Sequence, residues 1–289
     1  MADLVLDVFT CDGAGGNPVT VRTLDEPLEP GPMMAEAAGH ESRETAFLLP
    51  PATAGGPCRV EVVTARRQIP FSGHAALGAA RAARERLLPG GPDEVVLAMA
   101  LGDVDLRFED GTAWLTAPTI ELGSDWPAPE VRATLGLRGP APAGQEPPRL
   151  AGAGLPILVV PVGGLEELHA CHLDAAAFRA FGVRMVRHKA LHARVYAFCR
   201  ETRSADNHLS ARLFLPAEEE ALEDPASGGA AACLGACLAV RGGLEPAGRE
   251  IRIEQGFEMG RPSLLRLRAG RHGGIEVGGE VRPAPAGPA

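Results

Sequence analysis

The sequence has no long apolar run, few cysteines and no excess of basic residues. No segment approaches the roughly 18 consecutive apolar residues of a membrane span, and the first nine residues are acidic rather than basic, unlike a secretory signal. Six cysteines in 289 residues are too few for a disulfide scaffold, so we expect reduced thiols. The net charge of −9 argues against a nucleic-acid-binding protein. We therefore expect a soluble, cytoplasmic protein with enough length for two hydrophobic cores.

Lysine is almost absent, because Lys189 is the only one. Together with abundant arginine, alanine, glycine and proline, this indicates GC-rich coding DNA, so the glycines and prolines are weaker turn signals than usual. Among the segments rich in proline and glycine, residues 123–149 are the best candidate for a linker. We predict an N-terminal half at 1–122, this linker, and a C-terminal half at 150–274, with a strand near 275–282 that can return to the first half.

The pattern of strands and helices repeats once along the chain. Each half has strand-like segments around one helix that is apolar on all faces, at 72–88 and at 227–240. SGHAA opens the first helix and SGGAA the second, about half the chain apart. A helix without a polar face must be enclosed, and small side chains let a sheet wrap closely around it. The sequence predicts an α+β fold with two pseudo-symmetric halves, each a mixed, barrel-like sheet around one central helix.

The two helix starts are candidates for an anion site. Each begins with Ser-Gly, at Ser72-Gly73 and at Ser227-Gly228. Free N–H groups at a buried helix start bind anions, and two starts at one cleft would hold a carboxylate or stabilise an enolate. The alternative is that both serines act only as N-caps, the commoner role of serine before a helix. We expect the Gly73 and Gly228 amides to face each other across a gap that fits a small acid.

Five segments stand out, in order along nearly the whole chain: DVFT…GGNPVTV (7–21), RETAFL (43–48), IPFSGHAALGAA (69–80), SARLFLP…EDPASGGA (210–230) and IEQGFEMGRPSLL (253–265). Together they resemble the PhzF-like isomerases of phenazine biosynthesis. The last segment is the most specific, and the third is almost as specific. The resemblance implies a diaminopimelate-epimerase-like fold with the active site between two similar halves. It also implies a homodimer that moves a proton on a small amino or hydroxy acid without cofactor or metal.

The resemblance implies three catalytic residues. The family's general acid/base, the glutamate of Glu-Thr-Ala-Phe, corresponds to Glu44. A carboxylate in an apolar strand beside a closing cleft suits reversible proton transfer, although the residues alone would favour a solvent-facing glutamate. The family's Gly-His histidine is His74, which we expect to be neutral at a helix start and to donate to substrate or relay a proton, with a core histidine as the alternative. The aspartate before proline is Asp224, expected to orient the substrate's amine or the imidazole, with a turn-forming aspartate as the alternative.

The sequence departs from the family at Gly229. The family usually reads Asp-Pro-Ala-Thr-Gly-Ser where this chain reads DPASGG at 224–229, so a hydroxyl is absent. A buried hydrogen bond is worth about 1 kcal/mol, and its loss favours a substrate other than the phenazine precursor. Gln68 stands where family members often carry glutamate. Related racemases place cysteines where Ser72 and Ser227 stand, and serine is too weak an acid to replace a thiolate, so we do not expect two-base racemisation.

We predict a cofactor-independent isomerase that uses Glu44, His74 and Asp224. The amides of Gly73, His74, Gly228 and Gly229 would hold the substrate's carboxylate, and the substrate-binding residues would be Asn17, Ser72, Gly73, Ser227, Gly228 and Gly229. The substrate would be a small unsaturated acid of antibiotic metabolism, such as the dihydro-hydroxyanthranilate precursor of phenazines or an alkylproline precursor. The alternative is a catalytically silent binding or interaction protein on the same fold.

No metal, nucleotide, nucleic acid or membrane is expected as a partner. The glycine-rich loop at 13–16 is followed by a strand rather than the helix of a dinucleotide fingerprint. The HACH motif at 169–172 lacks a second cluster of metal ligands. Cys233 and Cys237 lie four apart on an apolar helix and are expected to pack in the core.

Overall fold

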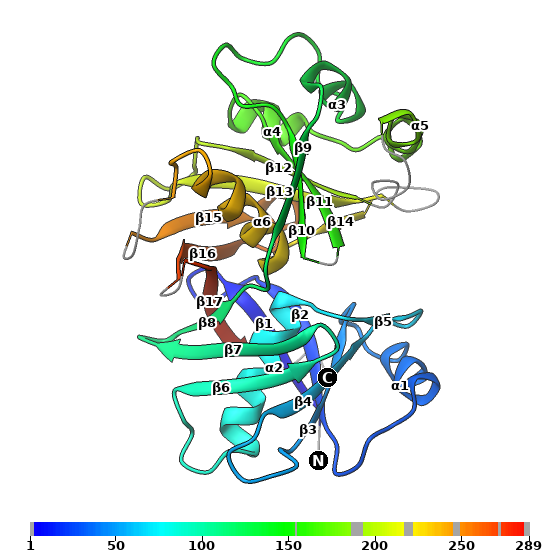
Figure 1. The fold of residues 1–289 in the computed structure, drawn as a ribbon, viewed down its shortest axis with the longest axis vertical. Helices are drawn as coiled ribbons and strands as arrows, with labels where there is room; N and C mark the ends of the chain where they lie inside the picture. The colour runs from blue at the N-terminus through cyan, green and yellow to red at the C-terminus, as the bar shows by residue number, and fades with distance from the viewer. Residues whose placement is uncertain are drawn as a thin grey trace.

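The computed structural model describes residues 3–153, 155–185, 193–216, 222–244, 249–270 and 273–285. Figure 1 shows two halves stacked along the longest axis, the N-terminal half below the C-terminal half. The lower half contains β1 (Leu4–Thr10), β2 (Asn17–Thr23), α1 (Pro30–Ala37), β3 (Thr45–Leu49), β4 (Cys58–Val63), β5 (Gln68–Ile69), α2 (Gly73–Arg86), β6 (Glu94–Met99), β7 (Gly102–Glu109), β8 (Thr112–Thr116) and β17 (Ile275–Pro283).

The upper half has the remaining elements. They are β9 (Glu121–Asp125), α3 (Ala128–Thr134), β10 (Arg149–Ala153), β11 (Leu155–Pro161), α4 (Leu165–Ala170), α5 (Ala175–Met185), β12 (Arg194–Cys199), β13 (Leu209–Leu215), β14 (Leu222–Asp224), α6 (Gly228–Ala239), β15 (Ile251–Gln255), a 3₁₀ turn (Phe257–Met259) and β16 (Ser263–Ala269). Among the described residues, no helix is long and apolar enough to cross a membrane.

The two halves pair their strands in the same order. In the first half, β1–β2 is antiparallel, β2–β3 parallel, β3–β4 antiparallel, β4–β6 parallel, and β6–β7–β8 antiparallel. In the second half, β10–β11, β11–β12, β12–β13, β13–β15 and β15–β16–β17 follow the same sequence of directions. The short strands β5 and β14 join at matching places. This repeat confirms the predicted α+β fold of two pseudo-symmetric halves.

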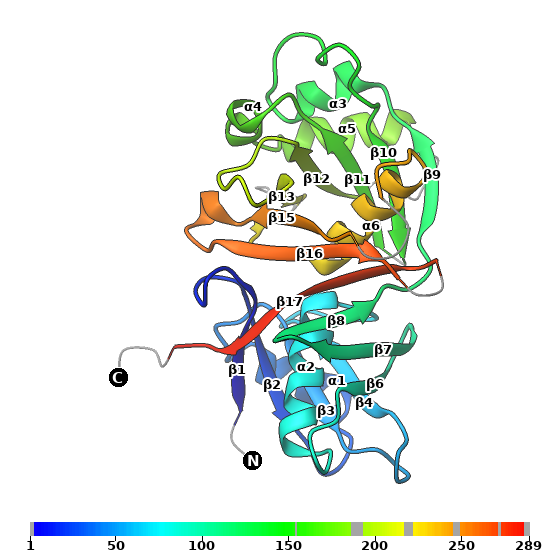
Figure 2. The same ribbon diagram turned by 90° about the vertical axis from the view of Figure 1, so that its left-hand side faces the viewer.

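Strand β17 belongs to both sheets. It pairs with β16 of the upper half and with β1 and β8 of the lower half, so that the lower sheet closes into a barrel. Figure 2 shows β16 and β17 crossing the junction, with α2 below them and α6 above. Because the hydrogen-bonded ladder runs continuously through β17, the sheet itself holds the two halves together.

Each sheet wraps around one central helix, α2 or α6. Alanines and glycines make up most of both helices, and nearly all of these residues are buried. At Gly78 a Cβ atom would lie 2.6 Å from Val19 Cγ1, so glycine allows β2 to approach the α2 backbone. The small-residue composition therefore determines how tightly each barrel closes, and both helices begin near the junction between the halves.

Residues 123–149 are more structured than the predicted linker. They include the end of β9, which pairs with β10, and helix α3. Trp126, Val131 and Leu135 are buried in a second core that also includes Phe178 and Phe181 of α5. The high proline and glycine content predicts a linker because the apolar residues in this segment are widely spaced. These few apolar side chains nevertheless pack in the second core and hold the segment on the upper half.

Candidate active site

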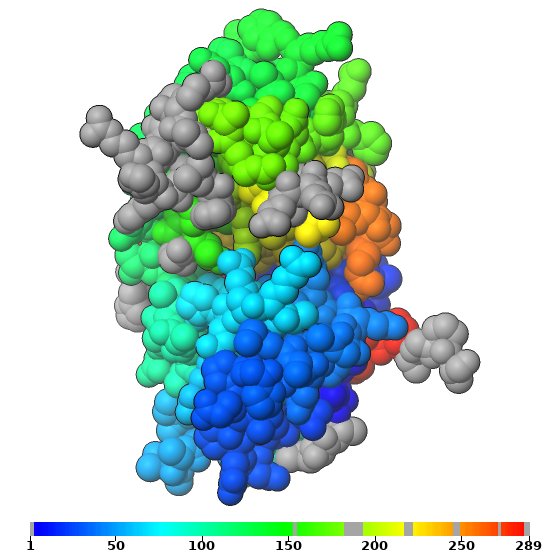
Figure 3. All heavy atoms as spheres, turned by 90° about the vertical axis from the view of Figure 1, so that its right-hand side faces the viewer, coloured from blue at the N-terminus to red at the C-terminus, as the bar shows by residue number. Residues whose placement is uncertain are grey.

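A small cavity lies between the halves, where both central helices begin. Its volume is about 50 Å³, room for a few water molecules. Figure 3 shows one outer face on which the lower half, in blue and cyan, meets the upper half, in green to orange. The cavity is lined by Glu44, Ile69, Phe71, Ser72, Gly73, His74, Leu115, Ala117, Pro118, Ile120, Leu155, Ile157, Arg194, Asp224, Ser227, Gly228, Gly229, Ala230, Ala232 and Cys233. These include every predicted site residue except Asn17.

The two helix starts touch each other beside the cavity. A Cβ atom on Gly73 would lie 3.3 Å from the Cα atom of Gly228, so the two glycines are in direct contact. The expected gap between them is therefore wrong: glycine at both positions lets the helices abut, and the ligand space lies alongside. In the described chain, no hydrogen bond is found from the Gly73, His74, Gly228 or Gly229 amides, as expected for a first helical turn. These N–H groups can therefore bind an anion.

The two serines behave differently. Ser227 caps α6, since its hydroxyl accepts a hydrogen bond from the Ala230 amide at 3.3 Å. Ser72 makes no such cap on α2. Its hydroxyl instead lies 3.2 Å from Nδ1 of His74. The N-cap alternative thus holds for the second helix only, and Ser72 orients the imidazole.

Glu44 and His74 face each other in the cavity. The distance from His74 Nε2 to Glu44 Oε2 is 3.5 Å, and the side chains are 7% and 13% exposed, respectively. Both atoms are buried without a hydrogen-bond partner among the described residues. The Glu44 backbone is held because its carbonyl accepts hydrogen bonds from the Thr20 amide and the Ser42 hydroxyl. Buried polar atoms are normally satisfied, so these two atoms are left available for a hydrogen bond with a ligand in the cavity.

Asp224 also lines the cavity and is held by residues of both halves. Its Oδ1 accepts hydrogen bonds from Asn17 Nδ2 at 2.7 Å and from the Ala226 amide at 3.2 Å. Asn17 Nδ2 also donates to the Ala226 carbonyl at 2.7 Å. Gln255 Nε2 donates to the Asp224 carbonyl at 2.8 Å, and Tyr196 donates to Gln255. Burial raises the pKa of Asp224, the charge of Glu44 adds to this shift, and His74 and Arg194 oppose it.

Asn17 does not line the cavity and is connected to it by its hydrogen bond to Asp224. Its side chain is 5% exposed, lies outside the cavity lining, and donates to Asp224 and Ala226 across the junction. We assign it an orienting role in place of the predicted substrate contact. Asn17 in β2 and Asp224 at the end of β14 lie 207 positions apart in the sequence, so residue patterns alone could not show this bond.

Two cavity residues with ionisable side chains, Arg194 and Cys233, are not among the predicted site residues. Arg194 opens β12, where a single arginine at a strand start carries no recognisable signal. Cys233 lies on the buried face of α6, as expected for core packing, but it also lines the cavity. Burial raises the pKa of the Cys233 thiol to about 12, so it stays protonated at neutral pH and is not a base for proton abstraction.

No candidate metal centre is found in the part of the chain that the structure describes, since no three His, Cys, Asp or Glu side chains gather there in a suitable group. The chemistry available in the cavity is instead a carboxylate beside an imidazole, a second carboxyl group, and two sets of free amides. This set can move a proton and stabilise the negative charge that develops on a carboxylic acid.

Comparisons with known proteins identify the family of this chain. Residues 6–281 match the family described as phenazine biosynthesis-like protein. An uncharacterised isomerase of Mesorhizobium japonicum is 33% identical, with 94% of this chain and 91% of the relative covered. Trans-2,3-dihydro-3-hydroxyanthranilate isomerase of Pseudomonas aeruginosa is 31% identical, with coverages of 92% and 89%.

Solved structures show the same fold. A PhzF-family protein from Bacillus anthracis superimposes with a TM-score of 0.79 at 22% identity, covering 99% of this chain and 98% of that one. A probable proline racemase from Agrobacterium radiobacter has a TM-score of 0.61 at 15% identity, with coverages of 98% and 90%. With a family match over nearly its whole length and relatives named as isomerases, the chain belongs to the phenazine biosynthesis-like (PhzF) family and is an isomerase.

Proposed function

We propose that this chain is a cofactor-independent isomerase of specialised, antibiotic-type metabolism, in which Glu44 moves a proton along a small unsaturated amino or hydroxy acid. The observation that carries the proposal is the unpartnered pair of Glu44 Oε2 and His74 Nε2 beside two helix starts in one cavity. A purely structural glutamate and histidine would satisfy these atoms within the protein.

The positions of these groups support the following reaction. Glu44 removes a proton from a carbon conjugated with the substrate's carboxylate, and the C–H electron pair moves into the conjugated system. The amides at the helix starts stabilise the negative charge on the carboxylate oxygens, and one such donor is worth ~10²–10³ in rate. The same carboxyl group returns the proton at the other end of the conjugated system. His74, held by Ser72, and Asp224, held by Asn17, orient the substrate.

The phenazine precursor is a second candidate substrate. The Pseudomonas aeruginosa relative is named as trans-2,3-dihydro-3-hydroxyanthranilate isomerase and covers most of the chain. Against it stands Gly229, where a Cβ atom would have no neighbour within 4 Å. The space that a serine hydroxyl would occupy is open, which favours an acid with a different substituent there.

The test is proton exchange with solvent. The enzyme is incubated in heavy water with trans-2,3-dihydro-3-hydroxyanthranilate and with a panel of small unsaturated amino and hydroxy acids, and deuterium incorporation and double-bond position are followed by NMR. We expect at least one acid to incorporate deuterium at a catalytic rate. If acids bind but none exchanges, the chain is the silent binding protein instead. The cytoplasmic location and the homodimer remain predictions, the latter to be tested by sedimentation velocity.

A further inference from the structure

Arg194 places a positive charge in the wall of the cavity. It is the first residue of β12, and its backbone lies opposite Ile157 of β11, which also lines the cavity. The side chain makes no salt bridge or hydrogen bond with any residue in the described part of the chain, and Asp224 and Glu44 act on it only through their charges. Its guanidinium donors are therefore available to a ligand.

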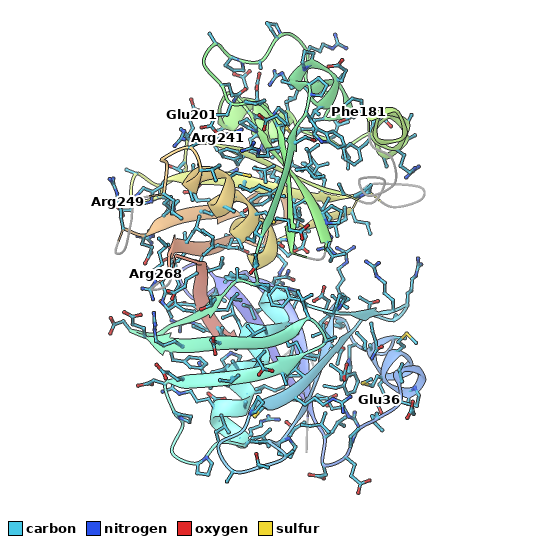
Figure 4. The ribbon with its side chains drawn as sticks, in the orientation of Figure 1. Glu36, Phe181, Glu201, Arg241, Arg249 and Arg268 are labelled. Carbon is cyan, nitrogen blue, oxygen red and sulfur yellow. The ribbon has the colours of Figure 1, made fainter. Side chains whose placement is uncertain are left out.

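Several other arginines in shielded positions have carboxylate partners. Arg132 binds Glu167 at 2.8 Å, and Arg212 binds Glu223 at 2.8 Å. Arg241 and Arg268, labelled in Figure 4, bind Glu146 and Glu276, each at 2.7 Å. A guanidinium removed from water normally needs such a partner. Arg194 is half-buried, has no such carboxylate partner among the described residues, and lines the cavity, where a ligand could supply the anion.

The nearby carboxylates do not fully compensate Arg194. Burial lowers the pKa of Arg194, and attraction to Asp224 and Glu44 opposes that shift without cancelling it. Oδ1 of Asp224 is already engaged by Asn17 and Ala226, and Glu44 faces His74. Because arginine stays protonated in proteins, an anion bound in the cavity would offset the remaining cost of burial.

We propose that Arg194 binds a second acidic group of the substrate, so that the substrate is a small unsaturated acid with two anionic groups. One carboxylate lies on the amides at the helix starts and the other on the guanidinium. The inference rests on the proposed function for the position of the first carboxylate. The open space at Gly229 is consistent with it, since the cavity has lost a hydroxyl there while it presents a charged donor at Arg194.

The test is equilibrium binding of small unsaturated acids, measured by calorimetry. Crotonate supplies one carboxylate, whereas maleate, fumarate, glutaconate and muconate supply two at increasing separations. We expect at least one diacid to bind the wild-type protein about 10-fold or more tightly than crotonate, the size of one charge-assisted hydrogen-bonded contact. In Arg194→Gln this preference should disappear while crotonate affinity changes less than about 2-fold. Arg194→Lys should keep part of the preference, since it keeps the charge but loses the planar fork.

Arg67→Gln is the matched control. Arg67 is exposed, lies outside the cavity lining, and is close enough to influence Arg194 electrostatically, so its loss makes the same change in net charge. It should keep the diacid preference. Equal binding of monoacid and diacids by the wild type, or a preference that survives in Arg194→Gln, would overturn the proposal. Because no turnover is needed, such a failure is distinct from failure of the exchange reaction that tests the proposed function.

Discussion

The two helix starts belong to equivalent elements, yet they carry different groups. On α2, the residue after the first glycine is His74, and Ser72 orients its ring. On α6, the corresponding residue is Gly229, and Ser227 caps the helix. The strands show the same contrast, since Glu44 directly precedes β3 whereas Arg194 begins β12, the equivalent strand of the second half. The duplicated fold provides two similar arrangements of strands and helix, and in the proposed mechanism the first half supplies the proton-transfer group and the second half an additional anion-binding group.

The contrast predicts that the largest loss of activity comes from Glu44 in the first half. Glu44→Gln keeps the side chain's shape but cannot accept a proton, so turnover should fall by ~10²–10⁴ with substrate affinity nearly unchanged. His74→Ala should cost less, because that residue only assists. Steady-state kinetics with the acid identified by exchange measures both effects.

The control for this prediction is Glu41→Gln. Glu41 is an exposed residue three positions earlier in the same loop and lies outside the cavity lining, so its loss should leave turnover unchanged. A Glu44→Gln enzyme with turnover near that of the wild type would mean that a different base removes the proton.

The hydrogen bonds from Asn17 to Asp224 and Ala226, which cross the junction between the halves, predict a smaller loss of activity than Glu44→Gln. Asn17→Ala removes the donor to Asp224 Oδ1 and the Ala226 carbonyl, which should lower the free energy of unfolding by about 1–3 kcal/mol. Because Asn17 acts through Asp224, kcat should fall by about 10-fold while KM changes little, and the pH dependence of kcat should shift. Denaturant unfolding and pH–rate profiles test this. An increase in KM without a change in kcat would instead indicate that Asn17 contacts the substrate directly.

Asp224 should make stability depend on pH. Its pKa is raised in the folded protein by burial, so the folded state holds the proton more tightly than the unfolded chain, whose aspartates titrate near pH ~4. This contribution to stability is complete below the unfolded pKa and is lost as pH rises through the folded one. The free energy of unfolding of the wild type should therefore fall more between pH 4 and pH 7 than that of Asp224→Asn. The variant should also be less active. Thermal unfolding at the two pH values checks the sign, and an unchanged difference would contradict it.

The smallest effect is expected at Gly229. A serine there meets no atom within 4 Å of its Cβ, and it should stabilise α6 by roughly 0.5 kcal/mol, because glycine is the poorer helix former. It also restores the hydroxyl expected from the family. Gly229→Ser should shift selectivity toward trans-2,3-dihydro-3-hydroxyanthranilate, measured as the ratio of kcat/KM for that acid and the preferred one. An unchanged ratio would show that Gly229 does not determine the substrate.

The features that could be predicted from the sequence are those that depend on local residue patterns and on the internal repeat. The two apolar helices, their Ser-Gly starts and the strand order led to the fold, and eight of the nine predicted site residues, all but Asn17, line the cavity. The sequence could not show that Gly73 and Gly228 are in contact, because the packing distance depends on the whole barrel. Nor could it identify Arg194, because its position in the cavity wall without a carboxylate partner among the described residues is visible only in three dimensions.

The central claim is that one carboxylate, Glu44, carries the proton through the whole reaction. It is tested most directly by running the wild-type reaction in heavy water and determining the face of the substrate on which deuterium is incorporated. Because a single carboxyl group can reach only one face of a bound substrate, we expect the proton to leave and return on the same face, and Glu44→Gln to incorporate no deuterium. Deuterium on the opposite face would show a second base and contradict the account.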